Sequence, residues 1–395
     1  MKKAAFHMIT GLLAIGLMFG ANLAQAQTGG LETTFGTALS QTKPGSIFKV
    51  VRTPNENQLN NALIASSASS PKDIWAVGES TIHFDGTKWT AFPAPFIDGV
   101  ENFLTGVVDV SPTLAWAVGN VIGGNPGQVI EQWDGKQWSV FPGPNFPPNS
   151  QAALFGMAST SANDIWAVGS LADAAGAGFN LFEHWDGTAW SATTIEAPPT
   201  GQALLGVSAD ATNDAWAVGF KGANGQTFAM HWNGSEWAEV ATPNVTKGTN
   251  RLEAVLALSP NNAWAVGFFT PANADREPRR TLILHWDGKT WKVVPSPNVG
   301  PKSNPLSGLT ANSANDIWAF GCHFAADGSG QFRTLVLHWD GKSWKVVPSP
   351  SPNPKGFAGD VLFSGVVPSP GNVWIFGSEH APFADTLAIH TTTGN

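Results

Sequence analysis

Six of the nine histidines recur in one sequence context, and this is the first pattern in the chain that suggests chemistry. Most precede an aromatic residue and then Asp-Gly or Asn-Gly, as in His285-Trp286-Asp287-Gly288. Neutral imidazoles are common metal ligands, so these side chains could hold a metal ion if they converged. The six are His83, His184, His231, His285, His338 and His390.

A second set of candidates lies where the chain does not repeat. Residues 275–280 carry the densest charge in the sequence, and Arg251 precedes Glu253 shortly upstream. Two non-repeating histidines stand in later variable segments, one of them next to the single cysteine, Cys322. These segments could form one mixed patch with several arginines; the alternative is a cluster of solvated loops. The candidate ligand-binding residues are Arg251, Glu253, Arg276, Arg279, Arg280, His323 and His380.

No catalytic motif can be recognised in the chain. It contains no zinc-type His/Glu spacing, nucleophile elbow, phosphate-binding loop or calcium loop of alternating aspartates. Paired carboxylates for glycoside hydrolysis would have to meet across distant parts of the fold. We therefore assign no catalytic residue, no metal and no cofactor.

The elements that position these residues come from an internal repeat. Asp73-Ile74-Trp75-Ala76-Val77-Gly78 returns in altered form along the chain, and each copy is followed by the His-Trp-Asp-Gly signature or its remnant. Each unit of roughly 50 residues contains four short apolar runs of strand length, separated by turn residues. The marker tryptophans are Trp75, Trp116, Trp166, Trp216, Trp264, Trp318 and Trp374.

This pattern predicts an all-β fold, a seven-bladed β-propeller with four antiparallel strands per blade. The last unit stops after its third strand, and residues 47–54 match the missing fourth strand. We therefore expect the N-terminal strand to complete blade seven and to remove the open sheet edge. The domain would cover residues 47–395, after a flexible leader at 27–46.

Within each blade, the Asp-Gly pairs predict two-residue hairpin turns. Such a turn would place Trp286 opposite Lys289 and make Trp286 and Trp291 diagonal neighbours. All 18 tryptophans follow the repeat, so we expect them mainly to pack blade against blade. The recurrent histidines lie on third strands, too far from the axis to converge on a metal, and should form hydrogen bonds within their own blades.

The first strands should line a central channel. The position eleven residues before each marker tryptophan forms a mostly apolar ring with one carboxylate, which could contact a ligand or simply be solvated. Loops between second and third strands share one face with the crossings between blades, and this variable-loop face is the expected functional one. The ring residues are Ile64, Thr105, Phe155, Leu205, Glu253, Ser307 and Phe363.

The N-terminus and composition indicate an exported protein. Lys2 and Lys3 precede a short apolar stretch and Ala24-Gln25-Ala26, which is typical of a signal peptide over residues 1–26. The net charge of −8 disfavours nucleic acid and anionic membranes as partners. We expect neither membrane insertion nor an intramolecular disulfide, and we expect a monomer.

The Asp-Ile-Trp-Ala-Val-Gly and His-Trp-Asp-Gly-x-x-Trp motifs resemble repeats of exported bacterial propellers, and the architecture is broadly similar to kelch-type and lectin-type propellers. Sialidase-like propellers need a tyrosine nucleophile, and this chain has no tyrosine. We expect a secreted, non-enzymatic binding module for a glycan or an extracellular protein surface. The alternatives are a polysaccharide-acting hydrolase or lyase with its site at the channel mouth, and a structural envelope protein.

Overall fold

A computed structural model describes residues 47–56, 60–95, 102–121, 127–198, 201–272, 278–327, 329–352, 359–381 and 383–391. The predicted signal peptide and leader lie outside these residues, as does Arg276. All elements in the described part are β-strands. No helix there has the length and apolar character needed to cross a membrane.

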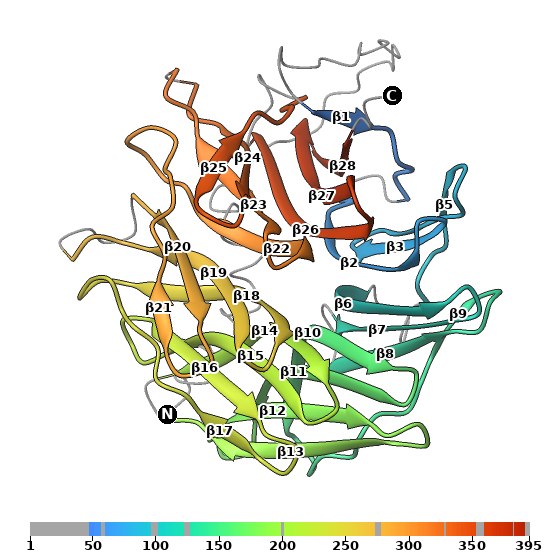
Figure 1. The fold of residues 1–395 in the computed structure, drawn as a ribbon. Helices are drawn as coiled ribbons and strands as arrows, with labels where there is room; N and C mark the ends of the chain where they lie inside the picture. The colour runs from blue at the N-terminus through green and yellow to red at the C-terminus, as the bar shows by residue number, and fades with distance from the viewer. Residues whose placement is uncertain are drawn as a thin grey trace, which may run out of the picture.

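The strands form five four-stranded sheets and one eight-stranded sheet, and the pairing along each four-stranded sheet is antiparallel (Figure 1). The first three sheets are β2 (Leu63–Ser70), β3 (Asp73–Gly78), β4 (Thr81–Phe84) and β5 (Trp89–Ala91); β6 (Asn102–Ser111), β7 (Leu114–Val121), β8 (Gln128–Trp133) and β9 (Trp138–Val140); and β10 (Gln151–Ser161), β11 (Asp164–Ala172), β12 (Gly178–Trp185) and β13 (Trp190–Glu196).

The next two sheets and the eight-stranded sheet complete the described part. They are β14 (Gln202–Ala211), β15 (Asp214–Lys221), β16 (Gln226–Trp232) and β17 (Trp237–Glu239); β18 (Asn250–Ser259), β19 (Asn262–Phe269), β20 (Arg280–Trp286) and β21 (Trp291–Val293); and β22 (Leu306–Ser313), β23 (Asp316–Phe324), β24 (Phe332–Trp339), β25 (Trp344–Val347), β26 (Gly359–Ser369), β27 (Asn372–Ala381), β28 (Phe383–Thr391) and β1 (Phe48–Val51).

The sheets stand around a central axis, with the first strand of each unit innermost (Figure 1). Each innermost strand contacts the next, and the series returns to its start: β2, β6, β10, β14, β18, β22, β26 and again β2. The predicted all-β architecture of four-stranded antiparallel units is therefore confirmed.

The N-terminal strand pairs with the C-terminal strand, as predicted. β1 lies antiparallel to β28, with Phe48 opposite Thr391. Asn55 Oδ1 accepts a hydrogen bond from the backbone N–H of Thr386 at 2.9 Å. Asn298 makes the same contact to Thr281 in the sheet that contains β20, at 3.1 Å. The N-terminal segment therefore repeats the contacts that a fourth strand makes elsewhere in the molecule.

Tryptophans fill the interfaces between sheets, as the sequence predicted. Trp216 is fully buried, and its ring centre lies 4.9 Å from that of Trp286 and 5.0 Å from that of Trp291 in the next sheet. Where β1 supplies the fourth strand, Phe48 takes the corresponding place against Trp318, at 5.6 Å. The edge-to-face geometries are those that aromatic quadrupoles favour.

The predicted hairpin register is wrong. Trp286 lies directly opposite Trp291, because the loop contains four residues and not two. Asp287 Oδ1 accepts hydrogen bonds from the backbone N–H groups of Lys289 and Thr290, and Gly288 supplies the positive φ of 88°. The aspartate side chain thus closes a longer loop than an Asp-Gly pair alone implies.

Candidate functional site

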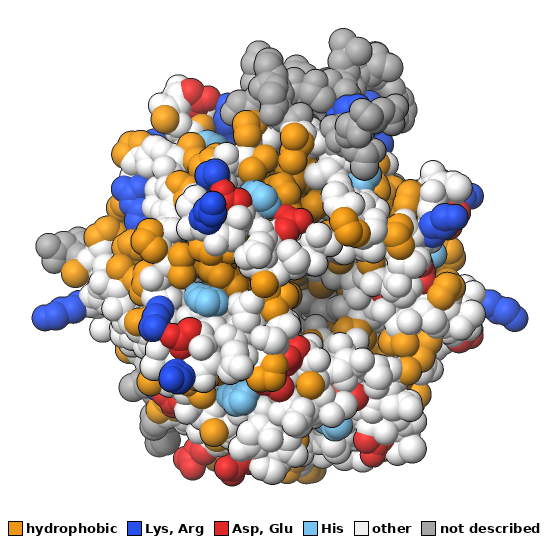
Figure 2. All heavy atoms as spheres, viewed as in Figure 1, with side chains coloured by type: hydrophobic (Ala, Val, Ile, Leu, Met, Phe, Trp, Pro, Cys, Tyr) orange, Lys and Arg blue, Asp and Glu red, His pale blue; other side chains and the backbone are white. Residues whose placement is uncertain are grey.

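The recurrent histidines form hydrogen bonds within their own sheets. His184 Nε2 lies 2.6 Å from Asp164 Oδ1, and its ring stacks on Trp166 with centres 4.2 Å apart. Four of the six histidines pair with aspartate in this way, and His285 and His390 pair with asparagine. Figure 2 shows histidines spaced around the hollowed centre of one face and not gathered at it. Among the described residues, no group of three His, Cys, Asp or Glu side chains is placed to hold a metal.

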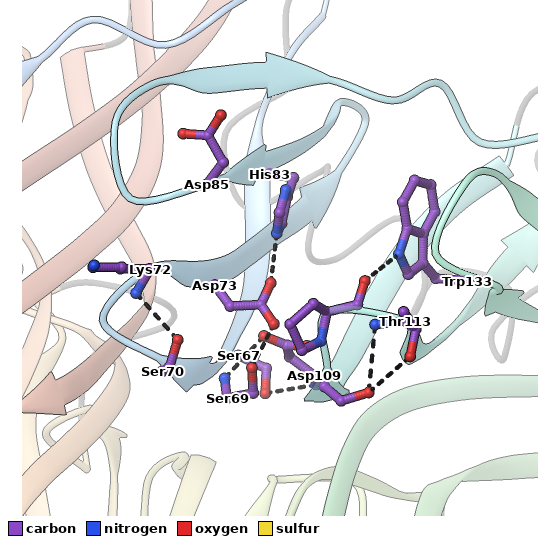
Figure 3. A network of polar contacts seen from close by, with 12 residues as sticks. Ser67, Ser69, Ser70, Lys72, Asp73, His83, Asp85, Asp109, Thr113 and Trp133 are labelled. Carbon is purple, nitrogen blue, oxygen red and sulfur yellow. Dashed lines mark hydrogen bonds and ion pairs between the residues drawn. The ribbon is translucent and has the colours of Figure 1, made fainter.

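The network around His83 shows why this histidine does not activate a serine nucleophile (Figure 3). Asp73 lies between the other two groups: its Oδ1 is 2.6 Å from His83 Nε2, and its Oδ2 accepts a hydrogen bond of 2.5 Å from Ser69 Oγ. A serine nucleophile needs the imidazole next to its hydroxyl, and here the carboxylate separates them. The network instead joins β2 to β6, since Asp109 Oδ2 accepts a hydrogen bond from the Ser69 backbone N–H.

Replacing one recurrent histidine with glutamine is expected to cost little. The second sheet already carries Gln132 at this position. His184→Gln should lower the free energy of unfolding by about 1 kcal/mol, the usual loss for one weakened hydrogen bond. Treatment with EDTA should leave unfolding unchanged. Urea denaturation followed by tryptophan fluorescence measures both effects, and strong destabilisation by EDTA would contradict a purely structural role.

The seven predicted channel residues all line one central cavity of about 240 Å³. Each lies where the innermost strand has a register shift against its neighbour, as Glu253 does between Leu252 and Ala254. A bulge inserts one residue that the ladder does not pair and so re-aims its side chain. The seven shifts fall at Ile64, Thr105, Phe155, Leu205, Glu253, Ser307 and Phe363.

The cavity lies toward the variable-loop face, because its lining comes from the first half of each innermost strand. Phe268 and Phe320, from the second strands β19 and β23, add to this lining. Neither residue was predicted from the sequence. The sequence offered one signal, because Phe320 replaces the valine of the repeated Ala-Val-Gly. In the structure the Phe320 ring packs on Gly308, and a Cβ at that glycine would lie only 2.4 Å from the ring.

Arg251 and Glu253 form an ion pair beside the cavity, which was not predicted from the sequence. Arg251 Nε lies 2.7 Å from Glu253 Oε1, and both side chains are largely buried. The guanidinium also lies over the ring of Phe220 in the preceding sheet, 4.6 Å from its centre. Burial raises the pKa of Glu253, while the charges of Arg251 and Arg279 oppose that shift.

The structure brings together only part of the predicted patch. The charge of Arg279 acts on Glu253 and opposes the rise in its pKa. The Arg279 guanidinium lies 4.7 Å from the centre of the Phe268 ring, which lines the cavity. Arg280 points elsewhere and donates hydrogen bonds to the carbonyls of Gly300 and Pro301. His323 lies on β23 opposite Arg333 and is outside the cavity lining.

Two of the predicted site residues cannot be placed fully. Arg276 lies outside the described residues. The backbone of His380 belongs to β27, opposite Gly359, but its side chain lies outside the described part.

No protein-family model and no curated protein sequence matches the chain. Several solved structures share its fold. YCF48 bound to D1 peptide has a TM-score of 0.54 and 14% identity, over 91% of this chain and 100% of that chain. The WD40 repeats of RRP9 have a TM-score of 0.56 and 11% identity, over 87% and 97%. YCF48 from Cyanidioschyzon merolae has a TM-score of 0.52 and 17% identity, over 88% and 99%. The chain therefore has the fold of a β-propeller.

Proposed function

We propose that this chain is an exported, monomeric, seven-bladed β-propeller that acts as a non-enzymatic binding module. Its ligand would enter the central cavity from the variable-loop face. The observation that carries this proposal is the cavity itself, which is lined by seven bulged residues of six different types. Other lining residues repeat, such as Gly106, Gly156 and Gly206, whereas the bulged residues vary.

The count of seven rests on dividing the eight-stranded sheet in two. A single parallel bridge, between Phe332 and Gly359, joins β22–β25 to β26–β28 with β1. Each half by itself has four antiparallel strands, like the other five sheets. We count the two halves as blades six and seven.

The lining favours a protein or peptide ligand over a glycan. It is mainly apolar, with Phe155, Leu205, Phe268, Phe320 and Phe363 among its members. Sugar hydroxyls need several polar partners, whereas an apolar side chain gains from leaving water in such a cavity. The structural neighbour YCF48 was solved with a bound D1 peptide, so a propeller of this fold binds a peptide in another protein.

A polysaccharide hydrolase needs two carboxyl groups flanking the scissile bond. Glu253 is the only acidic residue in the described lining of the cavity, and Arg251 pairs with it. The geometry therefore favours binding over hydrolysis.

Filling the cavity should abolish binding without unfolding the protein. Phage-displayed peptides and a glycan array are first screened against residues 27–395. Ser307→Trp places an indole in the cavity, so ligands found in the screen should bind this variant at least about tenfold more weakly. The matched control is Asn312→Trp, because Asn312 is exposed near the other end of the same strand.

The control variant should bind as the wild type does. Equal binding by wild type and Ser307→Trp would place the site outside the cavity. Saccharide release from a polysaccharide incubated with the protein would contradict a binding-only module.

Export predicts that the secreted protein begins at Gln27, which N-terminal sequencing can check.

A further inference from the structure

Charge is distributed unevenly along the chain. Residues 60–245 contain 4 Lys and Arg against 17 Asp and Glu. Residues 246–355 contain 12 Lys and Arg against 7 Asp and Glu. The first segment forms the sheets from β2 to β17, and the second forms β18–β25. The fold therefore keeps an acidic part and a basic part of the ring apart.

The segregation is visible at the surface. Figure 2 shows basic side chains interspersed with acidic ones near β20, β21 and β25, where Lys292 pairs with Asp287 and Lys345 pairs with Asp340, whereas Asp and Glu dominate the edge with β13 and β17. On the variable-loop face, cations come from the loops and strand ends of β18–β24. We call this group the basic sector; two of its members are paired, Arg251 with Glu253 and Arg333 with Asp327, and its described members are Lys247, Arg251, Arg279, Arg280, Lys302 and Arg333.

Some cations of the basic sector contact neutral groups, so no opposite charge compensates them there. Arg280 donates hydrogen bonds of 3.1 and 2.8 Å to two backbone carbonyls. Lys302 Nζ lies 4.4 Å from the centre of the Phe324 ring. Carbonyls and ring faces attract a cation but carry no net charge of their own. The field of these groups therefore extends toward a ligand.

The basic sector is also held in a fixed position. The backbone N–H of Arg279 donates to Ser303 Oγ at 2.8 Å, and its carbonyl accepts from the Asn304 backbone N–H at 2.8 Å. Asn304 is fully buried and ties this crossing to the start of β22. A partner would therefore meet these charges with little ordering cost.

We propose that the basic sector docks an acidic polypeptide segment, and that an apolar side chain of this segment enters the adjoining cavity. The proposal rests on the proposed function, because it takes the chain to be a binding module. Carboxylates of the partner meet the cations at the rim, and the apolar cavity accepts a neighbouring phenylalanine or leucine. The acidic sheets β2–β17 repel the same segment and so fix its orientation.

The test uses a fluorescein-labelled peptide in which glutamates flank a single phenylalanine. Its affinity for residues 27–395 is measured by fluorescence anisotropy at low and high salt. An analogue with glutamine in place of every glutamate is the neutral comparison. Affinity for the glutamate peptide should exceed that for the analogue by at least about tenfold at low salt and fall as salt screens the charges.

Two charge-reversal pairs locate the docking surface. Lys247→Glu with Lys302→Glu changes two exposed lysines of the basic sector and should weaken binding by at least about tenfold. Lys88→Glu with Lys136→Glu makes the same change of charge at exposed turns of the acidic sheets and should leave affinity within about twofold. Equal affinity for the glutamate and glutamine peptides would overturn the proposal.

The proposed function and this inference fail in different ways. If Ser307→Trp abolishes binding while the Lys247 and Lys302 pair has no effect, the cavity is used and the basic sector is not, which overturns the inference. If the pair abolishes binding while Ser307→Trp does not, the basic sector stands and the cavity assignment fails. Binding of an oligogalacturonate without binding of the peptide would also overturn the inference, because the partner would then be an anionic glycan.

Discussion

Replacing Phe48 with alanine is expected to lower the free energy of unfolding by about 3–5 kcal/mol. Phe48 is fully buried in a cluster with Trp318, Leu362 and Ile389. Phe48 is the first residue of β1, which pairs with β28 at the opposite end of the chain. The substitution leaves a cavity where the N-terminal strand packs against the C-terminal part of the chain. Equilibrium urea denaturation followed by tryptophan fluorescence measures the loss.

Ile47→Ala is the matched control. Ile47 precedes Phe48 and is 43% exposed, so its truncation should cost less than about 0.5 kcal/mol. A chain that begins at residue 60 removes β1 entirely and should be destabilised more than Phe48→Ala, because β28 then also loses its ladder partner. If the shortened chain unfolds at the same urea concentration as the full chain, the N-terminal strand does not hold the ring together.

Substituting Glu183 with glutamine is expected to stabilise the protein at alkaline pH by about 3 kcal/mol. Glu183 is fully buried on β12, and burial raises its pKa to about 7, with a hydrogen bond from Gln128 opposing the shift. Glu131 on β8 has the same pKa for the same main reason. The corresponding position is apolar in the later sheets, for example Leu284 in β20.

The direction follows from linkage. A carboxyl whose pKa is raised by folding is protonated in the folded state and ionised in the unfolded state over the intervening pH range. Its contribution to stability is therefore complete below the unfolded pKa, near 4.5, and is lost as the pH rises through 7. Asp109 and Glu56, whose pKa values burial raises to about 7, act in the same direction. These carboxyls should therefore lower the stability of the wild-type protein mainly as the pH rises from about 4.5 to 7, with little further loss above about pH 8.

Histidine acts in the opposite direction but mainly at lower pH. Burial lowers the pKa of His390 to about 4, so its contribution is lost as the pH falls below 6.5. Urea denaturation of wild type and Glu183→Gln at pH 5 and pH 8.5 separates these effects. The two proteins should differ by less than about 1 kcal/mol at pH 5. The control Glu196→Gln, at an exposed position of the same sheet, should show no gain at pH 8.5.

The repeat carried most of the information about the fold. Trp75 and its six equivalents recur with the His-Trp-Asp-Gly signature, so the strands, their order and the aromatic interfaces could all be predicted. The match of residues 47–54 to a fourth strand predicted the pairing of β1 with β28. The hairpin register could not be predicted in this way, because it depends on how the Asp287 side chain closes the loop, and Asp-Gly occurs in loops of more than one length.

Less of the candidate site than of the fold could be predicted from the sequence. Position relative to the marker tryptophan predicted all seven channel residues, because the bulge recurs at one place in every innermost strand. Phe268 and Phe320 were missed because they come from second strands, which elsewhere pack between sheets. The different positions of Arg279 and Arg280 could not be predicted, because Arg279 lies in the loop before β20 and Arg280 is the first residue of that strand. Arg279 lies over a cavity-lining ring, whereas Arg280 holds backbone carbonyls.

Hydrogen–deuterium exchange with and without a selected peptide tests most directly whether the central cavity is the binding site. New protection is expected near the start of the innermost strands, at residues such as 64–66, 205–207, 253–255 and 307–309, together with the loops of the basic sector. Protection confined to the Asp-Gly turns of the opposite face, with these strands unchanged, would contradict it.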